Sequence, residues 1–123
     1  MIIGIGVDMC SVSRMRRSIN IGGFLERVFH EEELEYVSGS SRPEESLAGS
    51  FAAKEAFAKA LGIGLSKLGL KGAWVRRTAR GPVLCLDDRI SEYARSIGVD
   101  KIFLSISHER EMAVAFVVLE GGV

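Results

Sequence analysis

The sequence has 123 residues, of which 47% are hydrophobic, and its 16 basic and 16 acidic side chains give a formal net charge of zero. This length and apolar fraction suit one ordinary domain, which we expect to span residues 1–123 and to need no disulfides. No apolar run is long enough for a transmembrane helix, and the N-terminal apolar run ends at Asp8 without a basic leader, so we expect a cytoplasmic protein with no membrane partner.

The chain opens with an alternating segment, residues 2–9, which predicts a β-strand. Isoleucine and valine alternate along one face, and Gly4, Gly6 and Asp8 share the other. Glycine inside a strand often marks the close approach of a ligand or of another backbone. The two glycines are therefore expected to leave open space beside the Asp8 carboxylate.

Helical segments follow this strand. Ser11 or Ser13 caps a helix that runs to about residue 20, a second segment begins at Phe24, and residues 31–37 form a third that opens with acidic side chains. The strongest helix covers residues 43–61, because alanine dominates it and Pro43 suits its first turn. A glycine-rich connection follows it.

The second half is expected to be mostly strands. The pattern predicts strands at 73–79 and 83–86, a helix that starts at Asp87 and Asp88 and ends at Gly98, and strands at 101–107 and 112–119. This order predicts an α+β fold with a mainly antiparallel sheet. The last strand is apolar on both faces, so it needs a second layer, which a helix of the same chain or a partner subunit could provide.

Charge is segregated along the chain. Residues 30–45 carry six acids against the single base Arg42, and residues 54–80 carry seven bases against the single acid Glu55. The basic stretch could be a surface built for an anion, or a solvated helix face followed by a basic strand edge. A nucleic-acid surface is disfavoured because aromatic residues are not interleaved with the bases.

Glu55 is the central candidate within the basic stretch. It could form an ordinary helical pair with Lys59, four residues later. The surrounding alanines and the flanking Lys54 and Lys59 favour a site for a metal-bridged phosphate instead. Asp8 and Glu55 would then hold Mg²⁺, with substrate phosphates and water completing its coordination. The sequence has no GxxxxGK[ST] loop of the common nucleotide-binding type.

Several motifs in this order resemble a known family. The stretches are GIGVD at 4–8, FLERVF at 24–29, FAAKEAFAKALG at 51–62 and LSISHERE at 104–111. They are similar to the 4'-phosphopantetheinyl transferases, and most of all to the small bacterial holo-[acyl-carrier-protein] synthase type. The resemblance covers most of the chain.

The resemblance implies a reaction that serves fatty acid and lipid biosynthesis. The phosphopantetheine arm of coenzyme A moves to a serine of an apo acyl carrier protein, and 3',5'-ADP leaves. Asp8, Glu55 and Lys59 would be catalytic, with Asp8 and Glu55 holding Mg²⁺ and with Lys54 and Lys59 on phosphates. The general base stays open between Glu55 and a metal-bound water.

The resemblance also implies contacts for both substrates. Ser107 and His108 resemble family positions near the 3'-phosphate of coenzyme A, although outside this family pattern they would be a surface turn that closes a hairpin. Gly62 and Gly64 could end the helix as a flexible connection, lie with their backbone close to the pantetheine or adenine of coenzyme A, or do both. The acidic carrier would meet Arg14, Arg27 and Phe24, while the roles of Arg16 and Arg17 stay open. His30 is interpreted as a structural helix cap.

Family members of this size are typically homotrimers with active sites between subunits. One departure is Ser50, which stands where the family often has arginine, so Lys67 or Arg76 could supply that phosphate contact. The alternative to the enzyme is a non-catalytic module that binds coenzyme A or a carrier protein. Loss of transfer on substitution of Asp8 or Glu55 would distinguish the two.

Overall fold

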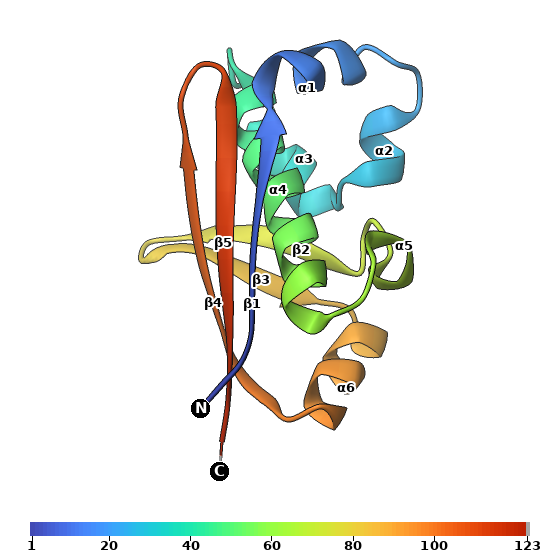
Figure 1. Cartoon of the computed structure of the whole chain (residues 1–123). Coiled ribbons are helices and arrows are strands. Elements are labelled where there is room, and N and C mark those ends of the chain that lie inside the picture. Colours follow the sequence, from blue (N-terminus) through green and yellow to red (C-terminus); the bar gives the residue numbers. More distant parts are fainter. Residues whose placement is uncertain (123) are drawn as a thin grey trace.

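The computed structural model describes residues 1–122 and has two antiparallel sheets packed around one long helix (Figure 1). The larger sheet has the strand order β1-β5-β4, from Ile2–Ser11, Met112–Gly121 and Val99–His108. The smaller sheet pairs β2 (Ala73–Thr78) with β3 (Gly81–Leu86). The expected α+β fold with antiparallel pairing is confirmed. None of the helices in the described residues is long and apolar enough to cross a membrane.

Helix α4 (Pro43–Leu61) is the central element and lies against β1 and β5. Pro43 occupies its first turn, and Gly62 ends it in the left-handed conformation, with φ of +76°. Its bounds match the sequence prediction. A helix covered by sheets and smaller helices suits this alanine-rich sequence, because small side chains let backbones approach closely.

Gly4 and Gly6 are the places where that approach is closest. A Cβ atom on Gly4 would collide with the carbonyl oxygen of Ala60, and one on Gly6 would collide with that of Ala56. The expectation of open space beside Asp8 is therefore wrong. The glycines admit the backbone of α4, and this contact brings the helix against the strand that carries Asp8.

Three short helices cover the N-terminal end of α4. Helix α1 (Val12–Ser18) is capped by Ser11, whose hydroxyl accepts a hydrogen bond from the Arg14 amide at 3.2 Å. Helix α2 is Phe24–Val28, and α3 is Glu31–Val37. His30 caps α3, because its Nδ1 accepts from the Glu32 amide and its own amide donates to Glu33. The structural role expected for His30 is confirmed.

Two further helices lie beyond α4. The glycine-rich connection contains the short helix α5 (Leu65–Leu68), for which the sequence has no helical pattern. Helix α6 (Asp88–Ser96) is capped by Asp87, whose side chain accepts from the Ile90 amide. On α6, Ile90 and Ala94 are buried as expected, whereas Tyr93 and Ile97 stay partly exposed.

The two faces of the larger sheet differ in burial. The inner side chains of β5 are fully buried beneath α4, at Ala113, Ala115, Val117 and Leu119. The outer face is apolar and open to solvent in the described chain, with exposed fractions of 44–62% at Ile5, Val7, Met9, Phe103 and Phe116. The expectation that the last strand is apolar on both faces is confirmed, and no element among residues 1–122 covers its outer face.

Candidate active site

Asp8, Glu55 and Lys59 meet where β1 lies against α4. Asp8 projects from the inner face of β1, and Glu55 and Lys59 lie one turn apart on α4. The Lys59 ammonium donates to Asp8 Oδ1 at 3.0 Å and to the carbonyl oxygen of Val7 at 3.1 Å. The described ion pairs thus join Lys59 to Asp8, and not to Glu55.

The Asp8 and Glu55 carboxyl groups lie close enough to affect the pKa of Glu55. Burial raises the pKa of Glu55, and a hydrogen bond from its carboxyl group to Asp8 together with the Asp8 charge raises it further, while Lys59 lowers it. In the metal-free protein Glu55 therefore holds its proton to a higher pH than an ordinary glutamate. A positive charge beside this pair would favour the ionised form of both carboxyl groups.

The donor set fits a hard divalent cation. Among residues 1–122 no group of three or more histidine, cysteine, aspartate or glutamate side chains converges on one point. Two carboxylates alone leave most of an octahedral shell to water and to ligand oxygens, which is how Mg²⁺ binds beside phosphates. A site of this kind handles a phosphorylated ligand better than it holds a permanent structural metal.

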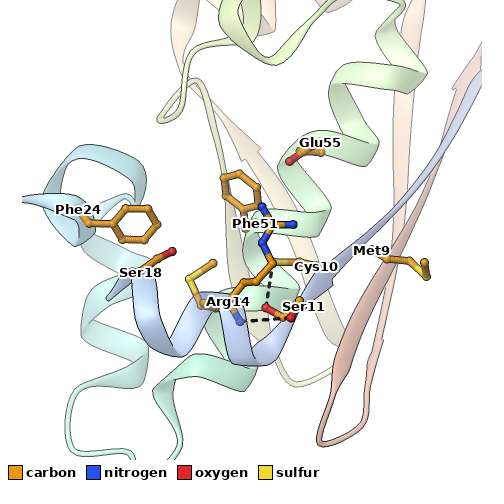
Figure 2. A pocket seen from close by; sticks show the side chains of 9 residues that line it. Met9, Cys10, Ser11, Arg14, Ser18, Phe24, Phe51 and Glu55 are labelled. Atoms are coloured by element: carbon orange, nitrogen blue, oxygen red, sulfur yellow. Dashed lines mark hydrogen bonds between the residues drawn. The ribbon is translucent and has the colours of Figure 1, made fainter. Parts of the chain in front are cut away.

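A pocket of about 290 Å³ opens beside Glu55 (Figure 2). In Figure 2, Arg14 rises from α1 toward Phe51 and Glu55 on α4, and Phe24 faces the same space from α2. The complete lining is Met9, Cys10, Ser11, Arg14, Met15, Ser18, Phe24, Phe51 and Glu55. The structure thus brings two of the predicted carrier contacts, Arg14 and Phe24, to one pocket with a predicted metal ligand.

Phe51 and Cys10 line the pocket beside the predicted carrier contacts. Phe51 lies four residues before Glu55, so the helical spacing itself places both on one side of α4. Burial, followed by the neighbouring Glu55 carboxylate, raises the pKa of the Cys10 thiol to about 11. The thiol is therefore protonated at neutral pH, and it lines the pocket without acting as a nucleophile.

The remaining arginines near this pocket lie apart from it. Arg27 is exposed in the last turn of α2 and does not line the pocket. Arg16 points to α4, where its Nε lies 3.5 Å from a carboxylate oxygen of Glu44. Arg17 is exposed.

Lys54 corrects the sequence prediction. Its side chain is fully buried, and its ammonium bonds the carbonyl oxygens of Val28 at 3.0 Å and Leu70 at 2.8 Å and Glu33 Oε1 at 2.8 Å. All three ammonium hydrogens are used, and burial lowers the pKa of Lys54 while Glu33 opposes that shift. A lysine held in this way cannot reach a phosphate, so the expected phosphate contact of Lys54 is wrong.

The basic stretch 54–80 does not form one continuous positive surface. Arg76 is neutralised by a two-point contact with Glu32, which lowers the pKa of that carboxyl to about 2. Arg77 lies over the Tyr36 ring, at 5.1 Å from its centroid, and its Nη2 lies 3.5 Å from Ser50 Oγ. The guanidinium beside Ser50 is therefore that of Arg77, and not that of Arg76.

The predicted coenzyme A residues lie in two separate places. Gly62 and Gly64 follow Lys59, at the end of α4 and at the start of α5. Ser107 and His108 are exposed at the end of β4, and the register pairs Ser107 with Val114, which pairs in turn with Met9. Two strand spacings, roughly 10 Å, separate β4 from β1. Within one chain, Ser107 and His108 therefore lie apart from Asp8.

Comparisons with known proteins agree with this geometry. A family model described as the 4'-phosphopantetheinyl transferase superfamily matches residues 4–116. A holo-[acyl-carrier-protein] synthase from Treponema denticola is 44% identical, over 98% of this chain and 100% of its own length.

Solved structures of similar proteins extend over the same range. The crystal structure of a holo-[acyl-carrier-protein] synthase from Neisseria meningitidis matches with a TM-score of 0.88 and 35% identity, and covers 98% of this chain and 99% of that chain. A holo-(acyl-carrier-protein) synthase from Bacillus anthracis, in complex with CoA (3',5'-ADP), matches with a TM-score of 0.82 and 37% identity, over 99% of each chain.

Proposed function

The chain belongs to the 4'-phosphopantetheinyl transferase superfamily, and we propose that it is a holo-[acyl-carrier-protein] synthase that acts on coenzyme A and an apo acyl carrier protein. The observation that carries this proposal is the meeting of Asp8, Glu55 and Lys59, of which Glu55 also lines a pocket shared with Arg14 and Phe24. A carboxylate pair and an exposed ammonium group, next to a pocket for a second substrate, suit phosphoryl transfer between two large molecules.

The proposed reaction exchanges a phosphoanhydride bond for a phosphate ester. The serine oxygen of the carrier bonds to the phosphorus that carries the pantetheine arm, the bond from that phosphorus to 3',5'-ADP breaks, and the serine proton leaves to a base. Asp8 and Glu55 would hold Mg²⁺, which supplies charge neutralisation at the pyrophosphate. Lys59 has an exposed fraction of 57%, so its ammonium can reach a phosphate oxygen while the buried backbone of α4 stays in place.

We propose that Arg14, Phe24 and Arg27 receive the carrier protein. Arg14 and Arg27 are exposed and carry no described ion pair, so they are available to an acidic partner. Phe24 offers an apolar contact at the pocket wall. This arrangement would bring the acceptor serine toward Glu55, on the other side of the same pocket.

We further propose a homotrimer with active sites between subunits. The uncovered apolar face around Val7 and Phe116 supports this proposal, because large exposed apolar patches on soluble domains mark interfaces. The distance between Asp8 and the pair Ser107 and His108 supports it too. A neighbouring copy could bring its own Ser107 and His108 to the nucleotide end of a ligand bound beside Gly62 and Gly64.

The experiment is steady-state transfer to an apo carrier protein with coenzyme A and Mg²⁺. Asp8→Asn and Glu55→Gln should each abolish transfer while circular dichroism stays that of the native chain, because only the cation ligands are lost. Glu92→Gln removes an exposed carboxylate of α6 and serves as the matched control, with unchanged activity. Full activity in either site variant would reject these residues as the metal ligands.

A further inference from the structure

The Lys59 ammonium occupies the position beside Asp8 that a cation would take. It donates to Asp8 Oδ1 at 3.0 Å and to the Val7 carbonyl oxygen at 3.1 Å. Because β1 is an edge strand of its sheet, one row of its carbonyl groups has no strand partner, and the bond from Lys59 satisfies one of them. The ammonium is thus held by one charged and one neutral oxygen.

A divalent cation and this ammonium compete for the same carboxylate. While Lys59 is paired with Asp8, the site offers two carboxyl groups, and one of them is already held by a positive charge. A cation that approaches Asp8 meets a like charge about 3 Å from the oxygen it must bind. The cation therefore has to displace the ammonium or bind Asp8 poorly.

We propose that Lys59 blocks the metal site of the free protein, and that a diphosphate ligand opens the site by drawing the ammonium away from Asp8. This inference rests on the proposed function, because the diphosphate is that of coenzyme A. The protein then binds its cation tightly only together with the nucleotide. Lys59 accordingly has two positions: on Asp8 in the free protein, and on a phosphate oxygen in the complex.

The construction of α4 suits such a movement. The backbone of the helix is fixed by buried alanines, such as Ala56 and Ala60, against the glycines of β1. The Lys59 side chain is 57% exposed and Asp8 is 18% exposed, so the contact faces solvent on one side. Exposed ion pairs of this kind are weak, and a diphosphate with two negative charges can therefore bind the ammonium without any movement of the helix.

The test measures binding of Mn²⁺ alone, by electron paramagnetic resonance of the unbound ion, to wild type, Lys59→Met and Lys71→Met. Lys71 is exposed and lies outside the site, so its variant controls for the loss of one positive charge. Lys59→Met should bind Mn²⁺ roughly three- to tenfold more tightly than wild type, as expected for removal of an exposed pair and of a nearby like charge. Lys71→Met should match wild type. Equal or weaker Mn²⁺ binding by Lys59→Met would overturn the proposal.

A second arm adds coenzyme A without a carrier protein. Coenzyme A should tighten Mn²⁺ binding to wild type by a larger factor than to Lys59→Met, because only wild type has an ammonium to withdraw. An equal factor in both proteins would contradict the proposal. Nuclear magnetic resonance of the Lys59 side chain, assigned by its absence in the variant, should shift when Mg²⁺ and coenzyme A are added together.

The outcome is separate from that of the proposed function. Transfer by the wild type is measured in its own assay, and Mn²⁺ binding needs no turnover. Active wild type with no gain of Mn²⁺ affinity in Lys59→Met rejects the blocking role alone. If the wild type is inactive but Lys59→Met binds Mn²⁺ more tightly, the transferase function is rejected, and the competition between Lys59 and the metal ion for Asp8 is still supported.

Discussion

Replacement of Lys54 by methionine should destabilise the fold without a specific effect on coenzyme A. The ammonium joins four parts of the chain: its own helix α4, the end of α2 at Val28, Glu33 on α3 and the segment before β2 at Leu70. Glu33 also accepts the amides of His30 and Val75. The pair is therefore the polar centre of the interface between α3, α4 and β2.

The magnitude follows from burial. Both side chains are at most 1% exposed, and removal of one partner of a buried pair costs about 3–5 kcal/mol, because the other charge stays unpaired. The double variant Lys54→Met with Glu33→Gln removes that charge and should recover about 2 kcal/mol of the loss. Lys71→Met changes an exposed lysine and should stay within about 0.5 kcal/mol of wild type.

The assay is urea unfolding at matched protein concentration, followed by the fluorescence of Trp74. This residue is the only tryptophan of the chain, and its ring stacks on His30 with 4.0 Å between centroids, so it reports directly on the interface of α3 with β2. An unfolding free energy equal to wild type in Lys54→Met, together with a raised KM for coenzyme A alone, would refute the structural role and restore the phosphate contact.

Three further predictions concern the strand, the carboxylate pair and the outer face. Gly6→Ala should lower the unfolding free energy by roughly 1–3 kcal/mol, because the added Cβ would collide with the backbone of α4. Gly22→Ala, whose Cβ would meet no neighbour, should leave the unfolding free energy unchanged. Equal unfolding free energies of the two variants in urea would contradict the contact of Gly6 with α4. Because the pKa of Glu55 is raised, the folded chain binds more protons than the unfolded chain above the ordinary glutamate pKa, and this costs stability as pH rises. Glu55→Gln should therefore raise the unfolding free energy of the metal-free protein at pH 7 and raise it less at pH 4. A larger increase at pH 4 than at pH 7 would contradict a raised pKa of Glu55. Phe116→Asp should shift the protein to smaller assemblies in sedimentation velocity, while Tyr36→Asp, an exposed change on α3, should not; a trimer in both would exclude the outer face as the interface.

The helices were predictable where local signals agree. Residues 31–37 and 43–61 carry acidic first turns, and the longer one also has Pro43 at its start and Gly62 at its end, so both helices begin and end where the pattern places them. Helix α5 has four residues between glycines. A segment that short has almost no periodicity of its own, and its structure depends on tertiary contacts such as Arg89 with the Leu68 carbonyl.

The candidate site was predictable in its carboxylates but not in its lysines. The four-residue spacing places Glu55 and Lys59 one helical turn apart. Their proximity to Asp8 depends on the contact of α4 with β1. Lys54 and Lys59 look equivalent in the sequence, since both flank Glu55. The two lysines differ because Lys54 forms a buried ion pair with Glu33, which lies 21 residues earlier in the sequence. No local sequence pattern indicates such a contact.

The most direct test of the central claim is the mass of an apo acyl carrier protein after incubation with this protein, coenzyme A and Mg²⁺. The proposed function predicts that the carrier gains the mass of one phosphopantetheine arm and that 3',5'-ADP is released in equal amount. A carrier that keeps its apo mass, although the protein binds coenzyme A and is folded, would contradict the claim and leave a binding module in its place.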